Sequence, residues 1–248
     1  DATLSPEGRT VDLVIEVETG SPVTILFSVD GAAPLAMESD PVPGLSLLEL
    51  VPLAREGSVD EDLLEDSSLR VENRLRNLGH RNAVVTHDRR SELGALSIVF
   101  TVDRGPQFRV LDVRFEGDQL VAELGALFGV AAAMPLVMAD VDAGVAALTT
   151  RYRQLGYRAA QVTAAVLERE PVDADGPSAI VPVSLVVEIV EGPLTTVGTI
   201  TFDDADTVFS AAELRTVVAS ASGQPFYAPL VLADGNAVRA RYLNEGYE

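Results

Sequence analysis

One short pattern occurs three times in this 248-residue chain and limits how the chain can fold. The pattern is the end of an amphipathic helix, a glycine, and the start of an apolar strand. A glycine suits the end of a helix because the residue there often takes a positive φ, which costs glycine nothing. The copies are 77 and 90 positions apart (156 − 79 and 246 − 156), counted between Gly79, Gly156 and Gly246.

A second pattern, an apolar strand that ends in a glycine-containing turn, repeats with nearly the same spacing. Its copies are 85 and 87 positions apart (105 − 20 and 192 − 105), counted between Gly20, Gly105 and Gly192. The two patterns together predict a repeated unit of about 80 to 90 residues. The predicted divisions are the closing strand of a preceding unit (residues 1–21), two complete units (22–105 and 106–193) and the N-terminal part of a further unit (194–248).

Hydrophobic periodicity predicts the same order of elements in each complete unit. In the first, we expect a strand (23–29), a loop (30–44), a short helix (45–53) and a long helix (58–78). Two strands (83–87 and 96–103) then follow on either side of a polar turn (88–94). Ser58 and Glu61 form a capping-box pattern at the start of the long helix. Its buried face is expected to carry Leu64, Val71, Leu75 and Leu78.

The second complete unit repeats this order. The expected elements are a strand (108–115), two helices (120–128 and 140–155) and two strands (159–167 and 183–189) separated by a loop (168–178). Outside the complete units we expect strands at 10–18 and 196–202, a helix that a capping box opens at Ser210 and Glu213, and a long helix at 231–245.

Each unit is therefore predicted to be strand, helix, helix, strand, strand, which is an α+β fold. Three strands alone make a marginal sheet, so both helices are expected to cover one of its faces. Two signatures accompany this order: Tyr-x-x-x-Gly-Tyr at Tyr152/Gly156/Tyr157 and Tyr242/Gly246/Tyr247, and Glu-Gly-Pro at Glu191-Gly192-Pro193. The first unit departs from them, with His80 in place of the tyrosine and Asp103-Arg104-Gly105-Pro106 in place of Glu-Gly-Pro.

This ordered recurrence resembles tandem POTRA domains over nearly the whole chain. The resemblance implies β-α-α-β-β units, each with a three-stranded mixed sheet covered on one face by two helices. It implies the periplasmic arm of an outer-membrane protein assembly factor of the BamA and TamA type, whose own C-terminal β-barrel lies outside this segment. Such an arm, at the periplasmic face of the outer membrane, receives unfolded outer-membrane proteins and docks partner lipoproteins.

The sequence leaves two other functions open. One is the POTRA arm of a two-partner secretion or lipid-export transporter, in which the same units serve one dedicated client. The other, from a different class, is a cryptic hydrolase, because a fold by itself does not exclude an active site.

The strands also indicate where a client would bind. The last strand of each complete unit is almost continuously apolar and suits the centre of a sheet, whereas the strand before it suits an edge. An exposed edge pairs with an extended client strand through backbone hydrogen bonds, which do not depend on the client's sequence. The predicted client-binding residues are Ala83, Val84, Val85, Thr86, Ala160, Gln161, Val162 and Thr163.

Composition excludes several classes of function. The formal net charge of −20 repels phosphate backbones, so nucleic acid is not an expected partner. The chain has no cysteine, which excludes a disulfide framework, a thiolate metal site and a cysteine nucleophile. It has no glycine-rich phosphate loop, HExxH sequence or nucleophile elbow. We therefore expect no enzyme, no cofactor and no metal.

Some residues have a functional and a structural interpretation, and we favour the structural one. Asp203, Asp204 and Asp206 lack the spacing of a calcium loop and are expected in a solvated turn. His80 is expected to pack after the helix end, and the tyrosines of the Gly-Tyr pairs in the core. Arg89 and Arg90 are expected in the polar turn, exposed to solvent.

Overall fold

A computed structural model describes residues 2–4, 11–13, 23–36, 42–52, 59–92, 95–117, 123–172, 179–203 and 208–247. Its internal contacts divide the chain into two compact bodies. The first comprises Asp1–Leu75 and Asn82–Arg104, and the second comprises Arg76–Arg81 and Gly105–Glu248.

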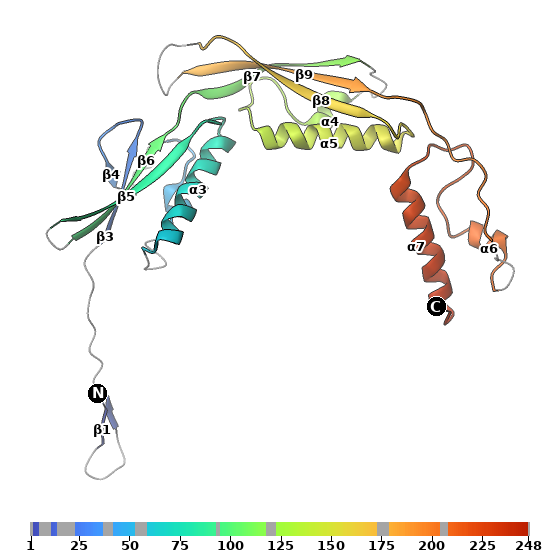
Figure 1. Cartoon of the computed structure of the whole chain (residues 1–248), viewed down its shortest axis with the longest axis horizontal. Helices are drawn as coiled ribbons and strands as arrows, with labels where there is room; N and C mark the ends of the chain where they lie inside the picture. Colours follow the sequence, from blue (N-terminus) through green and yellow to red (C-terminus); the bar gives the residue numbers. More distant parts are fainter. Residues whose placement is uncertain are drawn as a thin grey trace. The chain divides into compact units, whose positions relative to one another are not determined.

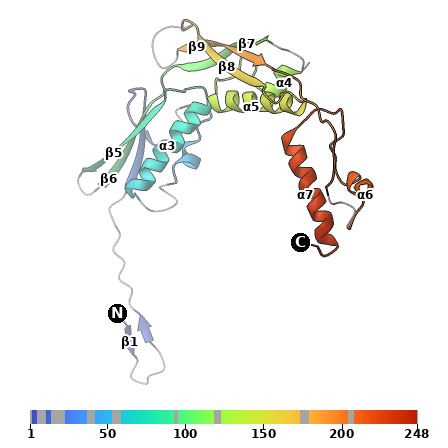
Figure 2. The same ribbon diagram turned by 45° about the vertical axis from the view of Figure 1, so that its right-hand side comes forward.

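The first body contains the predicted strand, helix, helix, strand, strand order. The elements are β3 (Val23–Val29), β4 (Leu35–Ala36), α1 (Leu47–Leu50), α3 (Glu61–Asn77), β5 (Val84–Glu92) and β6 (Ala95–Asp103). The sheet order is β4-β3-β6-β5, with β3 parallel to β6 and the other pairs antiparallel. Helix α3 runs alongside β5 and β6 on one face of this sheet (Figures 1 and 2).

Two predictions for this region are wrong. The sheet has four strands rather than three, because two residues of the predicted loop, Leu35 and Ala36, pair with β3. The polar turn predicted at 88–94 is too long, because β5 continues to Glu92 and β6 begins at Ala95. Polar side chains are tolerated in β5 because it lies at the edge of the sheet, where side chains reach solvent.

The core of the first body confirms most of the predicted helix face. Leu64, Val71 and Leu75 are fully buried, whereas Leu78 is only half-buried. Phe27 and Phe100, from the parallel pair β3 and β6, stack with ring centroids 5.0 Å apart. Burial of each such large side chain contributes about 1.5–3 kcal/mol.

Helix α3 begins with the amides of Leu63 and Leu64, which donate to the carbonyl of Asp60. The predicted cap residue, Ser58, lies outside the described residues. The helix ends at Asn77, and Gly79 follows with φ +93°, as the sequence predicts.

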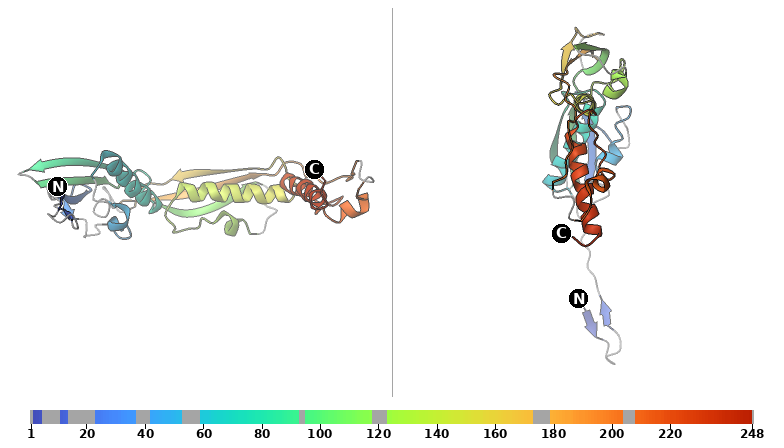
Figure 3. Two further views of the ribbon diagram at one scale, coloured as in Figure 1. Left: turned by 90° about the horizontal axis from the view of Figure 1, so that it is seen from below. Right: turned by 90° about the vertical axis from the view of Figure 1, so that its right-hand side faces the viewer.

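The second body contains the other complete unit: β7 (Gln107–Gly117), α4 (Leu124–Phe128), α5 (Met138–Gln154), β8 (Gln161–Glu168) and β9 (Ile180–Val190). The sheet order is β7-β9-β8, with β7 parallel and β8 antiparallel to β9, which confirms the predicted three-stranded mixed sheet. Both helices lie on one face of it (Figure 1; Figure 3, left). One core joins both layers, with Tyr152 and Leu148 of α5 fully buried.

The long helix of each complete unit ends in the same backbone contact with the segment that follows the unit. The Gly79 carbonyl accepts a bond from Phe108 N–H at 2.8 Å, and the Gly156 carbonyl accepts one from Thr195 N–H at 2.9 Å. A Cβ atom at Gly156 would lie 2.6 Å from the carbonyl oxygen of Thr195, which is closer than Cβ atoms approach. Both the positive φ and this contact therefore require glycine.

The second body continues with α6 (Ala211–Arg215) and α7 (Ala228–Asn244). The capping box at α6 is confirmed, with Glu213 N–H donating to Ser210 Oγ and Ser210 N–H donating to the Glu213 carboxylate. The strand predicted at 196–202 is wrong: its one pairing among the described residues is the isolated bridge Thr196↔Pro225. A strand needs a neighbouring strand, and the described residues place none beside this segment.

At the N-terminus, β1 (Ala2–Leu4) and β2 (Val11–Leu13) form an antiparallel pair. Strand β2 falls within the strand predicted at 10–18, and the rest of that prediction lies outside the described residues. The assignment of residues 1–21 to a preceding unit, and the other unit boundaries, remain predictions.

Candidate functional site: two exposed sheet edges

Each complete unit has one edge strand that follows its long helix. Strand β5 lies outside β6, and β8 lies outside β9. The apolar strands β6 and β9 are central, as the sequence predicts. An edge strand has backbone N–H and C=O groups on one side with no strand to pair with, and these groups are what an added strand would use.

The register shows which backbone groups of β5 face outward. Val85 is opposite Val102, whose carbonyl accepts a bond from Asp30 N–H and so points away from β5. In an antiparallel pair, such residues alternate with those bonded across the ladder. The outward-facing residues of β5 are therefore Val85, His87, Arg89 and Ser91.

The same argument applies to β8. The Ala179 carbonyl accepts from Gln107 N–H on the β7 side, whereas the Pro182 carbonyl accepts from Arg169 N–H on the β8 side. Even-numbered residues of β9 thus face β8, and their partners in β8 face inward. The outward-facing residues of β8 are Val162, Ala164, Val166 and Glu168.

The eight predicted client-binding residues divide into three groups. Ala83 and Ala160 are buried and precede the strands. Four others have exposed side chains, and their backbone groups face the neighbouring strand: Val84, Thr86, Gln161 and Thr163. Only Val85 and Val162 have backbone groups that face outward. Client binding by any of them remains a prediction.

Sequence reasoning missed six outward-facing residues: His87, Arg89, Ser91, Ala164, Val166 and Glu168. The period of two along a strand is the signal that locates them. It becomes usable only when the register with the central strand is known, because a shift of one residue exchanges inward-facing and outward-facing groups.

A groove of about 430 Å³ lies between α3 and the start of β5. It is lined by Glu61, Glu65, Ser68, Leu69 and Glu72 of α3 and by Val85, Thr86 and His87 of β5. An extended segment that paired with β5 would place alternate side chains beside this groove, because side chains of a strand alternate between its two faces.

One side chain already occupies the β5 edge. Val85 N–H, an outward-facing donor, is bonded to Glu72 Oε1 at 3.0 Å. The corresponding residues 77 positions later are Val162 and Thr149. Thr149 does not cap that edge, because its hydroxyl donates to the carbonyl of Val145 within its own helix at 2.7 Å.

A serine, a histidine and a glutamate meet at the groove. His87 Nδ1 lies 3.1 Å from Ser68 Oγ, and His87 Nε2 lies 2.8 Å from Glu61 Oε1. The residue types are those of a hydrolase triad, which the sequence did not indicate. Ser68, however, lies inside α3, where backbone N–H groups are bonded within the helix and none is available to stabilise an oxyanion. We therefore interpret the trio as a contact that holds β5 to α3.

The structure supports the structural interpretation of His80 and Tyr157, and contradicts it for Tyr247. His80 is buried, with its Nδ1 atom 3.1 Å from the carbonyl of Gly105. Of the tyrosines in the Gly-Tyr pairs, Tyr157 is half-buried and packs against the core and edge-to-face with Tyr152. Tyr247 is 48% exposed, so the prediction that it lies in the core is wrong. Arg89 and Arg90 lie in β5 and not in a turn, which corrects their predicted position. Asp204 and Asp206 lie outside the described residues.

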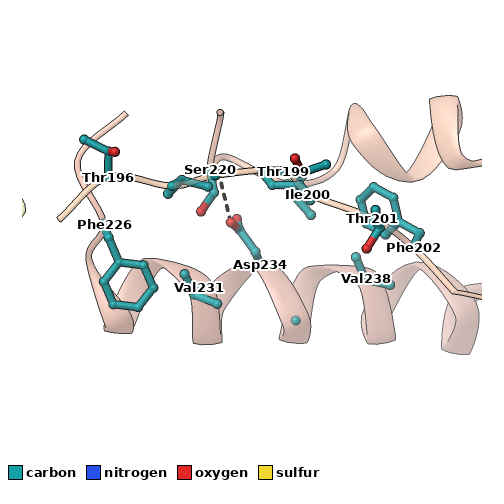
Figure 4. A pocket seen from close by; sticks show the side chains of 14 residues that line it. Thr196, Thr199, Ile200, Thr201, Phe202, Ser220, Phe226, Val231, Asp234 and Val238 are labelled. Atoms are coloured by element: carbon teal, nitrogen blue, oxygen red, sulfur yellow. Dashed lines mark hydrogen bonds between the residues drawn. The ribbon is translucent and has the colours of Figure 1, made fainter. Parts of the chain in front are cut away.

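A larger groove, of about 620 Å³, lies between residues 196–202 and α7 (Figure 4). Val231 and Val238 of α7 line it together with Ile200 and Phe202. In the second complete unit, β9 lies beside the corresponding strand β7 and β8 lies beside β9, and both strands contribute residues to the core. This groove is therefore an uncovered core face.

In the same region, Asp234 accepts a hydrogen bond from the amide of Ala219 at 2.7 Å and another from the amide of Ser220 at 3.0 Å, and Figure 4 shows the second. Hydrogen bonding from Ser220, together with the Ala219 amide and the positive charge of Arg215, holds the pKa of this carboxyl below its ordinary value of 3.8. Asp234 thus ties α7 to the segment that follows α6.

Metal-ligating side chains do not gather in the described part of the chain, where no group of three or more lies together. None of the helices described is both long enough and apolar enough to cross a membrane.

No protein-family model matches the chain, and neither does any curated protein. Among solved structures, the chain is similar to POTRA domains 3–5 of BamA from Haemophilus influenzae, with 18% identity, 93% of this chain and 89% of that chain covered, and a TM-score of 0.44. It is similar to the N-terminal domain of Omp85 from Thermosynechococcus elongatus, with 17% identity, coverage of 90% and 85%, and a TM-score of 0.39. It is also similar to CdiB from Escherichia coli, with 18% identity, coverage of 77% and 31%, and a TM-score of 0.31.

Proposed function

We propose that this chain is the POTRA arm of an outer-membrane protein assembly factor, located at the periplasmic face of the outer membrane. In this proposal the arm receives unfolded outer-membrane proteins by β-augmentation and docks partner lipoproteins. The observation that supports it is the pair of edge strands, β5 and β8, each with four outward-facing residues. Such an edge binds an extended segment through its backbone, which suits clients of many different sequences.

The expected binding is weak. Each backbone hydrogen bond contributes about 0.5–1.5 kcal/mol net, whereas ordering each client residue costs about 1–2 kcal/mol. Over five or six residues these terms nearly cancel, and side-chain burial adds a small gain. We expect dissociation constants from millimolar to high micromolar, or about −4 to −6 kcal/mol. Binding of this strength lets a client be passed on.

The test is an NMR titration of the full chain with peptides that match strands of outer-membrane β-barrels. We expect shifts of the outward-facing amides, such as those of His87 and Ala164, with smaller changes in β6 and β9. A proline in place of Ala164 should abolish binding at β8, because it removes an outward donor without removing a ladder bond. Unchanged amide signals of the central strand β9 in the same sample show that this unit of the variant is folded.

Two outcomes would change the proposal. If neither edge responds at millimolar peptide, the proposed function is wrong. If both edges respond to the strands of one client only, the dedicated client of a secretion or export transporter replaces the general one.

A further inference from the structure

We propose that a pocket between the end of α5 and the start of α7 binds the side-chain carboxylate of an acidic peptide segment, through Arg153 and Arg158. The pocket has a volume of about 290 Å³ and is lined by Arg153, Arg158, Phe226, Tyr227, Ala228 and Pro229. This inference goes beyond the proposed function, because the described lining includes no residue of β5 or β8.

Backbone hydrogen bonds within the second body join the two sides of the pocket. Thr195 N–H donates to the Gly156 carbonyl at 2.9 Å, and Phe226 N–H donates to the Thr195 carbonyl at 2.9 Å. Arg158 follows this glycine by two positions, and its guanidinium carbon lies 5.3 Å from the centroid of the Phe226 ring. The pocket is therefore formed before any ligand binds.

The pocket is positively charged, although the chain as a whole is acidic. Arg153 forms no ion pair with any residue in the described part of the chain, and neither does Arg158. None of the described residues that line the pocket is acidic. Both guanidinium groups are exposed, so an anion can reach them from solvent. The planar N–H fork of each matches the two oxygens of a carboxylate.

The corresponding position in the first complete unit shows which anion such an arginine takes. Arg81 is 77 positions before Arg158, and each follows the glycine after its long helix by two positions. The guanidinium carbon of Arg81 lies 4.3 Å from the centroid of the Phe108 ring, and its Nη2 atom lies 2.6 Å from Glu168 Oε1. A guanidinium stacked on a ring thus keeps N–H donors for a carboxylate. Arg158 has the ring, and no described residue supplies the carboxylate.

The two rings indicate what else the segment carries. Phe226 and Tyr227 are half-buried, whereas the residues 90 positions earlier are Leu136 and Val137. An aromatic side chain beside the carboxylate packs favourably against such rings. The net charge of −20 repels an anionic lipid surface far more than a segment with one carboxylate. The ligand class is therefore a short segment of low charge in which Asp or Glu neighbours an aromatic residue.

The experiment measures the binding of two short peptides to the full chain. Both have blocked ends and one aromatic residue, followed by Glu in one peptide and by Gln in the other. The NMR signals of the arginine Nε–H groups report where each peptide binds. We expect the Glu peptide to shift the signals of Arg153 and Arg158 and to bind about tenfold more tightly than the Gln peptide at low salt. This ratio should fall at high salt.

Two variants each remove one guanidinium group. Arg153→Gln and Arg158→Gln should each weaken binding of the Glu peptide about threefold. Arg153 makes no side-chain contact with a described residue that its loss would break, so a change in stability does not explain the effect. The matched control is Arg151→Gln, the same charge change in the same turn of α5 on an exposed residue outside the described lining, which should leave binding unchanged.

Each outcome has a definite meaning. Equal binding of the two peptides overturns this inference, and so does an equal loss of binding in Arg151→Gln and Arg153→Gln. If the chain ignores both peptides but binds vesicles of anionic phosphatidylglycerol through Arg153 and Arg158, the pocket takes a lipid headgroup and the inference is wrong. If neither peptide binds at millimolar concentration, the inference is also wrong, whereas the proposed function stands because it depends on β5 and β8.

Discussion

The two complete units share one fold, yet their long helices carry different residues at corresponding positions. The helix α3 has Ser67 and Glu72 where α5 has Gly144 and Thr149. In the first unit, Glu72 caps the edge strand, and in the second, Thr149 leaves the edge uncapped. One element, the long helix, thus determines both how closely the short helix packs and how open the sheet edge is. Three substitutions test that statement.

The largest effect is expected at Gly144. Its position in α5 faces Phe128 of α4, and a Cβ atom there would lie 2.5 Å from Cδ2 of that ring and even closer to its carbonyl oxygen. Gly144→Ser introduces the residue that the first unit has at this position, where Ser67 is fully buried and donates to the Leu63 carbonyl. Because the Phe128 carbonyl is part of the backbone of α4, it can move only if the helix moves. We therefore expect a loss of about 3 kcal/mol in the free energy of unfolding.

Chemical denaturation of the variant measures this loss. The reciprocal change, Ser67→Gly, is the control and should cost only about 1 kcal/mol, through the helix propensity of glycine. If Gly144→Ser is as stable as the parent protein, the two long helices are interchangeable at this position, and the comparison fails there.

The intermediate effect concerns Asp234, which occupies the same position in α7, 90 residues after Gly144. Where Gly144 packs closely against Phe128, Asp234 instead accepts hydrogen bonds from two backbone amides. Asp234→Asn removes the charge and leaves one side-chain oxygen for the two amide donors. We therefore expect a loss of about 1–2 kcal/mol in the free energy of unfolding at pH 7. Because the pKa of Asp234 is lowered in the folded chain, its contribution is present above pH 3.8 and is lost as the pH falls through the folded value.

The pH dependence provides the measurement. The stability difference between Asp234→Asn and the parent protein should shrink on acidification below pH 3.8. A difference that is the same at pH 7 and in acid would mean that the side chain stabilises α7 by packing and not by its charge.

The sequence predicts the architecture well because the apolar pattern is strongest where a strand is buried on both sides. Ile98, Val99 and Phe100 identify β6 as a central strand through their apolar side chains alone. The second half of β5 is not predictable in this way, because Arg89 and Arg90 lie at an edge where polar side chains are tolerated.

The candidate site is less predictable than the fold. The contacts of Glu72 with Val85 and of His87 with Ser68 join residues that are distant in sequence, so they depend on the packing of α3 against β5. The segment 196–202 shows the opposite error: its apolar alternation is that of a strand, but pairing requires a partner that local sequence does not provide.

The smallest effect is expected from transferring the cap to the second unit. Thr149→Glu places at the β8 edge the residue that caps Val85 in the first unit, 77 positions earlier. The new carboxylate should accept a bond from the outward N–H of Val162 and compete with an added strand. We expect neutral strand peptides to bind β8 about threefold more weakly, a change of about 0.6 kcal/mol, and exchange of the Val162 amide to slow by a similar factor. Thr149→Gln, which has the same length without the charge, should have the same effect on neutral peptides. If peptide binding at β8 is unchanged while the Val162 amide is protected, the cap does not compete with clients, and the difference between the two edges has another cause.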